Sequence, residues 1–300
     1  MRRAAFTLLE LIFVIVIMGI LAKFGVELLS QTYRSFILSS VNNRLQSQSE
    51  AAVESIASRL QYRIKDSVIA RKNSGNPNDF QALASSNYGN TATILEWIGS
   101  DIDGFRGDSA PLWSGIIDLN LSTQNTLVSP MTDTTAINTL IGILSDGNSS
   151  SINDAALYFI GSDSDINNYG WNGALTDHNG TMHPVRRDPA VGKESVFIPT
   201  RGDNGVDNNF SGVDVYEYYQ LAWSAYAVVH TPADGNLTLY YDYQPWKGEK
   251  YSDANRKKAV IMENVDTFRF KAVGSIIKIQ VCVKTDLIED YSLCKEKTVF

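Results

Sequence analysis

The sequence has little proline, cysteine and histidine, and no long block of like charge. Its 300 residues include 8 prolines, 2 cysteines and 3 histidines. The first proline is Pro77, so no residue before it interrupts a helix by lacking a backbone donor. The two cysteines, Cys282 and Cys294, allow one intramolecular disulfide, provided that this part of the chain leaves the reducing cytoplasm.

The charge distribution argues against nucleic acid as a partner. The formal net charge is −7, and basic residues beyond the N-terminus gather only at Arg256, Lys257 and Lys258. Nucleic-acid binding requires a basic patch or stripe. An apolar fraction of 44% over this length is enough to bury a core, which indicates a folded protein.

Recognisable catalytic motifs are lacking as well. The sequence has no nucleophile with a base at a recognisable spacing, no glycine-rich phosphate loop and no paired-carboxylate motif, so we expect no enzymatic activity. His178 and His183, with Asp177 and Asp188 nearby, have ligand types that zinc uses. Because no predicted helix fixes their geometry, we expect solvated loop histidines instead.

An apolar run near the N-terminus is the strongest feature that is present. It extends over residues 11–22, follows Arg2 and Arg3, and ends at Lys23. A cleaved secretory signal peptide would need small residues just beyond the run, and Ile20, Leu21 and Ala22 provide only a mediocre cleavage site. A single-span anchor would need about 20 apolar residues, a length reached only if the run is counted back across Glu10.

A third interpretation comes from residues 2–11, which read RRAAFTLLEL. This stretch resembles the class III signal of type IV prepilins and type II secretion pseudopilins. The resemblance implies that a prepilin peptidase removes residues 1–5, cutting between Ala5 and Phe6, and methylates the new amino terminus, while the apolar helix is retained. The family usually has glycine where this chain has Ala5, which is also small.

The same resemblance implies a place and a set of partners. The chain would be a single-pass inner-membrane protein, with its head in the periplasm or on an extracellular filament. Its partners would be other pilins or pseudopilins, the prepilin peptidase and the inner-membrane assembly platform. The competing hypothesis is a signal-anchored periplasmic enzyme or binding protein whose N-terminus is only a tether.

Glu10 is the acidic residue at the start of the apolar run. A carboxylate in hydrocarbon is costly and by default marks a function. Resemblance to the pilins implies that Glu10 pairs with the amino terminus of Phe6 on a neighbouring subunit and sets the register of assembly. The alternative is that Glu10 caps its own helix through the favourable helix dipole.

Apolar residues continue beyond the run at helical spacing. They are Val26, Leu29, Tyr33, Ile37, Val41 and Leu45, followed after a polar gap by Val53, Ile56, Leu60, Ile64 and Val68. The pattern predicts one long helix, or two abutting ones, from Phe6 to about Arg71. We divide it into a transmembrane or filament-core part (6–28) and an amphipathic continuation (29–71) whose apolar stripe packs on the head.

Residues 72–300 form the predicted head, in which polar loops separate short β-branched and aromatic runs. We expect strands at residues 93–98, 155–160, 195–198, 216–229 and 237–243. The turn at 232–235 joins the last two as a hairpin, with Leu237, Leu239, Tyr241 and Tyr243 on one face. A second hairpin turns at Gly274 and Ser275. The predicted fold class is α+β, a long N-terminal helix packed on an antiparallel head.

Residues 264–270, NVDTFRF, enter this late hairpin. Together with the size of the head and the order of elements, they resemble the large J-type minor pseudopilins and the related W-type minor pilins. The resemblance implies a minor subunit of a type IV pilus or a type II secretion pseudopilus.

Two further hypotheses concern the head. The acidic loop that begins at residue 203 has oxygen side chains at alternating positions, as Ca²⁺ requires, although turn chemistry alone also selects such residues. The candidate ligands are Asp203, Asp207, Asn209, Ser211, Asp214 and Glu217. The alternation in the last predicted strand places Cys282 on the polar face with Lys278, Gln280 and Lys284, where we expect a disulfide to Cys294 to clamp the C-terminal tail.

Overall fold

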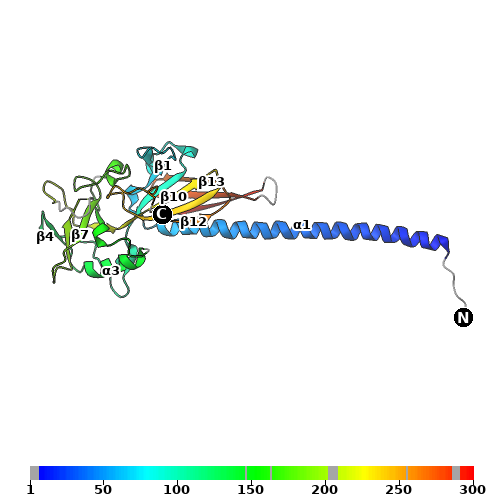
Figure 1. The fold of residues 1–300 in the computed structure, drawn as a ribbon, viewed down its shortest axis with the longest axis horizontal. Helices are drawn as coiled ribbons and strands as arrows, with labels where there is room; N and C mark the ends of the chain where they lie inside the picture. The colour runs from blue at the N-terminus through cyan, green and yellow to red at the C-terminus, as the bar shows by residue number, and fades with distance from the viewer. Residues whose placement is uncertain (1–6, 146, 163, 202–208, 255, 286–290) are drawn as a thin grey trace.

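The computed structural model describes residues 7–145, 147–162, 164–201, 209–254, 256–285 and 291–300. A long helix, α1 (Leu8–Leu60), projects from a head made of strands and short helices (Figure 1). At 1.5 Å per residue its 53 residues extend about 80 Å. The fold is α+β, as the sequence predicts.

The helix ends at Leu60, so the prediction of a helix to about Arg71 was wrong. Ile64 and Val68 belong to the buried stripe, but the Ile64 amide donates a hydrogen bond to the Ile98 carbonyl oxygen (2.9 Å) and not to its own helix. The chain then continues as η1 (Lys65–Ser67) and β1 (Ile69–Arg71). Apolar residues at intervals of four predict a helix, but here Ile64 and Val68 have that spacing in a segment that is not α-helical.

The strands within the described residues form three antiparallel sheets. The first has the order β12 (Lys257–Met262), β11 (Asn236–Tyr243), β10 (Ser224–Thr231), β3 (Ile94–Gly99), β1 and β2 (Phe80–Ala82). The second is β13 (Val265–Val273), β14 (Ile276–Lys284) and β15 (Ser292–Val299). The third is β4 (Asp118–Thr123), β5 (Thr126–Val128), β8 (Val196–Pro199), β7 (His183–Arg187), β6 (Ala156–Phe159) and β9 (Tyr219–Ala222).

Short helices complete the head. The α-helices are α2 (Ile102–Arg106) and α3 (Thr134–Leu144), and the 3₁₀ turns after η1 are η2 (Leu83–Ser85), η3 (Gly89–Thr91), η4 (Ile152–Asp154) and η5 (Ile166–Tyr169). Asp133 is the N-cap of α3, and its carboxylate accepts the backbone N–H groups of Thr135 and Ala136 at 3.0 and 2.9 Å. Such capping of otherwise unpaired donors fixes the start of a helix.

Most of the expected strands are present. Those predicted at 93–98, 155–160, 195–198 and 237–243 correspond to β3, β6, β8 and β11, and both predicted hairpins form, as β10–β11 and β13–β14. The strand predicted at 216–229 is two strands separated at Trp223. β9 pairs with β6 in the third sheet, whereas β10 pairs with β3 in the first, so the chain changes sheet between them.

The face assigned to Tyr243 is also corrected. Leu237 and Leu239 lie in the core beside α1, but Tyr243 is buried in the core on the other side of the first sheet. The register of β11 shifts before Tyr243, and Asp242 has a φ of 59°. An extra residue in one strand reverses the alternation beyond it.

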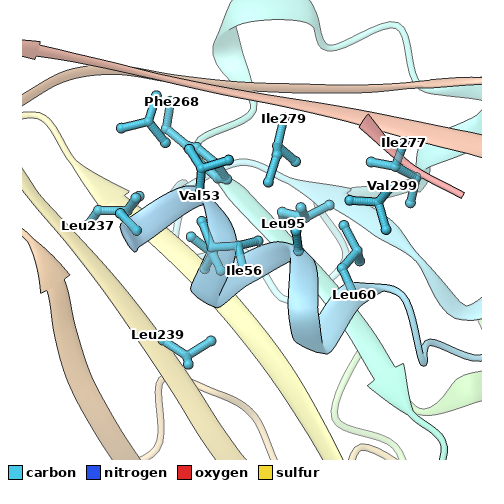
Figure 2. Packing of buried hydrophobic residues seen from close by; sticks show 14 of the residues in the cluster. Val53, Ile56, Leu60, Leu95, Leu237, Leu239, Phe268, Ile277, Ile279 and Val299 are labelled. Atoms are coloured by element: carbon cyan, nitrogen blue, oxygen red, sulfur yellow. The ribbon is translucent and has the colours of Figure 1, made fainter. Parts of the chain in front are cut away.

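The end of α1 is held between the first and second sheets. Val53, Ile56 and Leu60 pack against Leu237 and Leu239 of β11 and against apolar residues of the C-terminal sheet (Figure 2). The residues of that sheet in the same cluster include Phe268, Ile277, Ile279 and Val299. Two further cores lie between the first and third sheets, around Trp171 and Trp246, and against α3, around Phe197.

Candidate functional site

The N-terminal half of α1 has no part of the described chain against it. The first buried residue of the helix is Leu45, and the most apolar stretch of α1 is not buried inside the described molecule. Its exposed large side chains include Leu11, Phe13, Ile15, Ile17, Leu21 and Phe24. This helix is long and apolar enough to span a membrane, and an apolar surface of this extent marks contact with lipid or protein.

Glu10 lies one turn into this surface. Its carboxylate oxygen Oε2 accepts the Thr7 backbone N–H at 3.2 Å and the Thr7 hydroxyl at 3.0 Å. The Glu10 backbone N–H donates in return to Thr7 Oγ1 at 3.4 Å. This reciprocal arrangement is a capping box, and both side chains are exposed. In the isolated chain Glu10 therefore caps its helix, and its carboxylate remains accessible to a partner.

The expected processing site cannot be placed in the same way. Ala5 and Phe6 lie outside the described residues. Thr7, the next residue, is the N-cap of α1, so a cut before Phe6 would leave two residues ahead of the first residue of the helix.

The disulfide is confirmed, with a change in its setting. Cys282 of β14 is bonded to Cys294 of β15, and the two residues are direct partners in the strand register, with Cα atoms 4.0 Å apart. The segment expected to be a tail is a full edge strand that pairs with β14 from Ser292 to Val299. The bridge therefore joins two strands that already share a ladder.

The acidic loop is described only in part. Asp203 and Asp207 lie outside the described residues, whereas Asn209, Ser211, Asp214 and Glu217 are described. The Asn209 side-chain oxygen accepts the Ser211 N–H at 3.0 Å, a turn contact of the kind that the alternative interpretation predicts. Among the described residues no group of three metal-binding side chains gathers. Calcium binding stays a prediction.

The two histidines are not solvated, contrary to expectation. His178 and His183 are 1% and 3% exposed, and their rings stack with centroids 5.7 Å apart and planes at 2°. Phe210 lies 4.2 Å from the His178 ring, and Phe159 lies 4.7 Å from the His183 ring. Nothing in the sequence near the two histidines indicates this burial, because the aromatic partners come from distant segments.

Burial keeps both rings neutral. It lowers the pKa of His178 to about 4, and the nearby Asp177 carboxylate offsets part of this effect. Burial and the neighbouring His178 ring together lower the pKa of His183 to about 3. At neutral pH the two histidines therefore pack as uncharged rings beside the core that lies against α3.

A buried ion pair was missed from the sequence. Arg71 of β1 contacts Glu96 of β3, and both side chains are almost fully buried. The guanidinium also donates to the carbonyl oxygens of Pro77 and Trp171, each at 2.7 Å. The Tyr243 hydroxyl donates to Glu96 at 3.0 Å. Glu96 is the one charged residue in the predicted strand 93–98. A charge in a buried strand requires a partner, so Glu96 was the sequence signal for a buried ion pair.

The head also has a groove beside the end of α1. Its volume is about 720 Å³, and its walls include Tyr62, Phe105, Ile116, Tyr158 and Tyr218. The Tyr158 hydroxyl donates to Asp66 Oδ2 at 2.9 Å. Burial, together with this carboxylate, raises the pKa of Tyr158 to about 12, so the tyrosine keeps its proton at neutral pH.

Comparisons with known proteins give no lead. No family model matches the chain, and neither the curated proteins nor the solved structures contain a match.

Proposed function

We propose that this protein is a non-catalytic filament subunit, a minor pilin or pseudopilin that assembles through its N-terminal helix. The observation that supports this most directly is the bare apolar half of α1, because burial inside the molecule begins only at Leu45. An apolar helix of this length needs a membrane or other helices around it. In a filament, the corresponding helices of neighbouring subunits supply that environment.

Glu10 gives the proposal its mechanism. Cleavage before Phe6 would create an α-amino group near the start of the helix, with an ordinary pKa of about 8, so it carries charge at neutral pH. When the helix enters an apolar bundle, an unpaired amine or carboxylate is heavily penalised. Pairing of Glu10 with the amino terminus of the neighbouring subunit neutralises both groups and fixes the register between subunits.

The first experiment determines the mature N-terminus by mass spectrometry of the protein purified from membranes. Processing by a prepilin peptidase predicts a chain that begins at Phe6 and carries an N-methyl group. A chain that still begins at Met1 or Arg2 would contradict the proposal and favour a simple tether.

The second experiment tests Glu10 by crosslinking in vivo. We expect Glu10→Ala to abolish recruitment into filaments while export and cleavage continue, and Glu10→Gln to have a smaller effect. Two controls separate the explanations. Thr7→Val removes the side-chain partner of the cap and leaves the carboxylate, and Glu27→Ala removes the other exposed acid of this half. Assembly of Glu10→Ala at the wild-type level would reduce Glu10 to a capping residue.

The alternative function is a periplasmic binding protein or enzyme on a membrane tether. The groove of about 720 Å³ beside α1 favours it, since ligand sites are concave and mostly apolar. The mass of the mature N-terminus distinguishes the two hypotheses, because a tether requires no cut before Phe6.

A further inference from the structure

The outer face of the C-terminal sheet has positive charges placed opposite each other. Lys271 of β13 is the direct partner of Lys278 of β14 in the strand register. Arg269 lies two residues before Lys271 on the same face and is exposed. Side chains directly opposite on one face have Cβ atoms about 4.5–5.5 Å apart, and like charges there destabilise a sheet. The pairing is therefore a cost to the isolated fold.

The described residues neutralise this face only in part. Glu296 of β15 contacts Lys278, with Nζ 3.1 Å from the carboxylate oxygen. Neither Arg269 nor Lys271 forms an ion pair with any residue in the described part of the chain. By contrast, Lys284 on the same face contacts Asp266. An excess of two positive charges remains around Lys271.

A hollow lies at this excess charge. Its volume is about 310 Å³, and Asn90, Arg269, Lys271, Lys278 and Gln280 line it together with Glu296. A guanidinium beside ammonium groups and amides is suited to carboxylates or phosphates. We call it the basic hollow.

Its position argues against membrane phosphates as the ligand. Ile279, the neighbour of Lys278, is paired with Lys297, and Lys297 contacts Glu54 of α1 at 2.7 Å. From Lys23, where the apolar run ends, to Glu54 the helix rises about 46 Å at 1.5 Å per residue. Screening at physiological salt limits the range of an electrostatic interaction to about 8 Å. The basic hollow is therefore too far from a membrane that contains the apolar run to interact with its phosphates.

Most of the acidic residues of the head lie outside the C-terminal sheet. Residues 61–256 contain 12 Lys and Arg against 23 Asp and Glu, a net charge of −11, whereas residues 257–300 contain 8 against 6, a net charge of +2. A second copy of the chain therefore offers carboxylates to the basic hollow. The two surfaces differ, so the contact between copies is head-to-tail, and such contacts build open filaments when they do not close into a ring.

We infer that the basic hollow of one subunit docks the acidic part of the head of a second copy, and that this contact adds to the helix contacts between subunits. The inference deepens the proposed function and rests on it. Carboxylates of the second copy neutralise Lys271 and Arg269. The repulsion between Lys271 and Lys278, which destabilises the sheet of the free subunit, is therefore relieved on assembly. Such a contact weakens as salt rises.

Sedimentation velocity of the full chain in a neutral detergent tests the inference. The micelle covers the apolar half of α1, so association there reports on the heads. We expect the wild type to self-associate at low salt and to dissociate at 0.5 M NaCl. Lys271→Glu/Lys278→Glu should weaken this association by about tenfold or more. Lys284→Glu/Lys257→Glu makes the same change in net charge outside the hollow and should associate like the wild type.

Three outcomes would overturn the inference. The first is association of Lys271→Glu/Lys278→Glu at the wild-type level, and the second is an equal loss in the control variant, which would indicate net charge alone. The third is binding to vesicles containing phosphatidylglycerol that depends on Lys271 and Lys278, which would assign the hollow to lipid. An unchanged melting temperature verifies that the variant folds. If one of these outcomes is found together with a processed N-terminus and a Glu10-dependent filament, this contact is refuted and the proposed function is left intact.

Discussion

The two halves of α1 have the same helical backbone and opposite surroundings. Leu28 and Leu29 are 67% and 71% exposed, whereas Ile56 and Leu60 are completely buried between two sheets. An apolar stripe continues through both halves. Among the described residues, the head covers the apolar side chains of the C-terminal half only, so we expect the N-terminal half to meet a partner outside the described chain.

The largest effect is expected where the helix enters the head. Ile56→Ala/Leu60→Ala leaves cavities in the core shared by α1, β11 and the C-terminal sheet. Each such truncation costs about 2–5 kcal/mol, and the sum approaches the whole stability of a typical domain. We expect the head to lose its near-ultraviolet circular dichroism signal in detergent, or to unfold at far lower urea.

The matched control is Leu28→Ala/Leu29→Ala. It removes the same kind of side chain from the bare half, where the described chain makes no contact with them, so the urea midpoint of the head should not change. A similar loss in both variants would mean that the two halves are not energetically distinct.

A second prediction concerns the stacked histidines. Both rings are neutral in the folded head, with pKa values of about 4 for His178 and about 3 for His183, against about 6.5 in an unfolded chain. Below pH 6.5 the unfolded chain therefore binds more protons, and the stabilisation present at neutral pH is lost as pH falls toward 4. At pH 5 the loss is about 2 kcal/mol for each ring.

The measurement compares urea unfolding at pH 7.5 and pH 5 for the wild type and for His178→Phe/His183→Phe. Burial raises the pKa of Asp101 to about 6, which stabilises the fold as pH falls below that value and opposes the histidines. The double variant keeps Asp101, so the difference between the two proteins isolates the rings. Equal pH dependence in both would show that the rings do not resist protonation.

Local patterns explain why much of the fold was predictable. The hairpins β10–β11 and β13–β14 have alternating apolar residues on both sides of a turn, and Cys282 was placed on its correct face by the same alternation. The α1 helix followed from periodicity without proline. These features depend on residues close in the sequence, which a single chain reveals.

Features that depend on distant partners were not predictable. The end of α1 at Leu60 is fixed by a hydrogen bond from Ile64 to β3, and His178 is buried by Phe210. Helix α3 is a different case, because the N-cap Asp133 and the segment TTAINTLIGIL that follows it form a local capping and periodic pattern that predicts this helix. The assembly role of Glu10 stays a prediction, because the partner that we propose for it is another subunit.

The third prediction concerns the Cys282–Cys294 disulfide, which ties the edge strand β15 to the head. Its sequence separation of 12 residues corresponds to a stabilisation on the order of 3 kcal/mol, because the unfolded chain is constrained. We expect Cys282→Ser/Cys294→Ser to lower the urea midpoint of the head. Oxidised, purified protein should contain no free thiol in a maleimide assay, and detection of two free thiols would contradict the bond.

The smallest effect is expected on the exposed flank of the C-terminal half of α1. Lys295 and Lys297 of β15 contact Glu50 and Glu54 on the exposed flank of α1. Exposed ion pairs contribute little, because solvent and salt screen them. Because both pairs lie beside the buried stripe, we expect them to align β15 along the helix more than to hold it there. We expect Glu54→Gln to change the urea midpoint by an amount near the limit of detection, and less again at 0.5 M NaCl.

The matched comparison is a double-mutant cycle with Lys297→Gln. A coupling energy close to zero would place the attachment of the head in the apolar contacts of Ile56 and Leu60, as the contrast between the halves of α1 requires. A coupling energy as large as the effect of Ile56→Ala/Leu60→Ala would mean that the ion pairs of the charged flank hold the head on α1. In that case high salt would detach β15 from the helix, and protection of the β15 amides from hydrogen exchange would fall as salt rises.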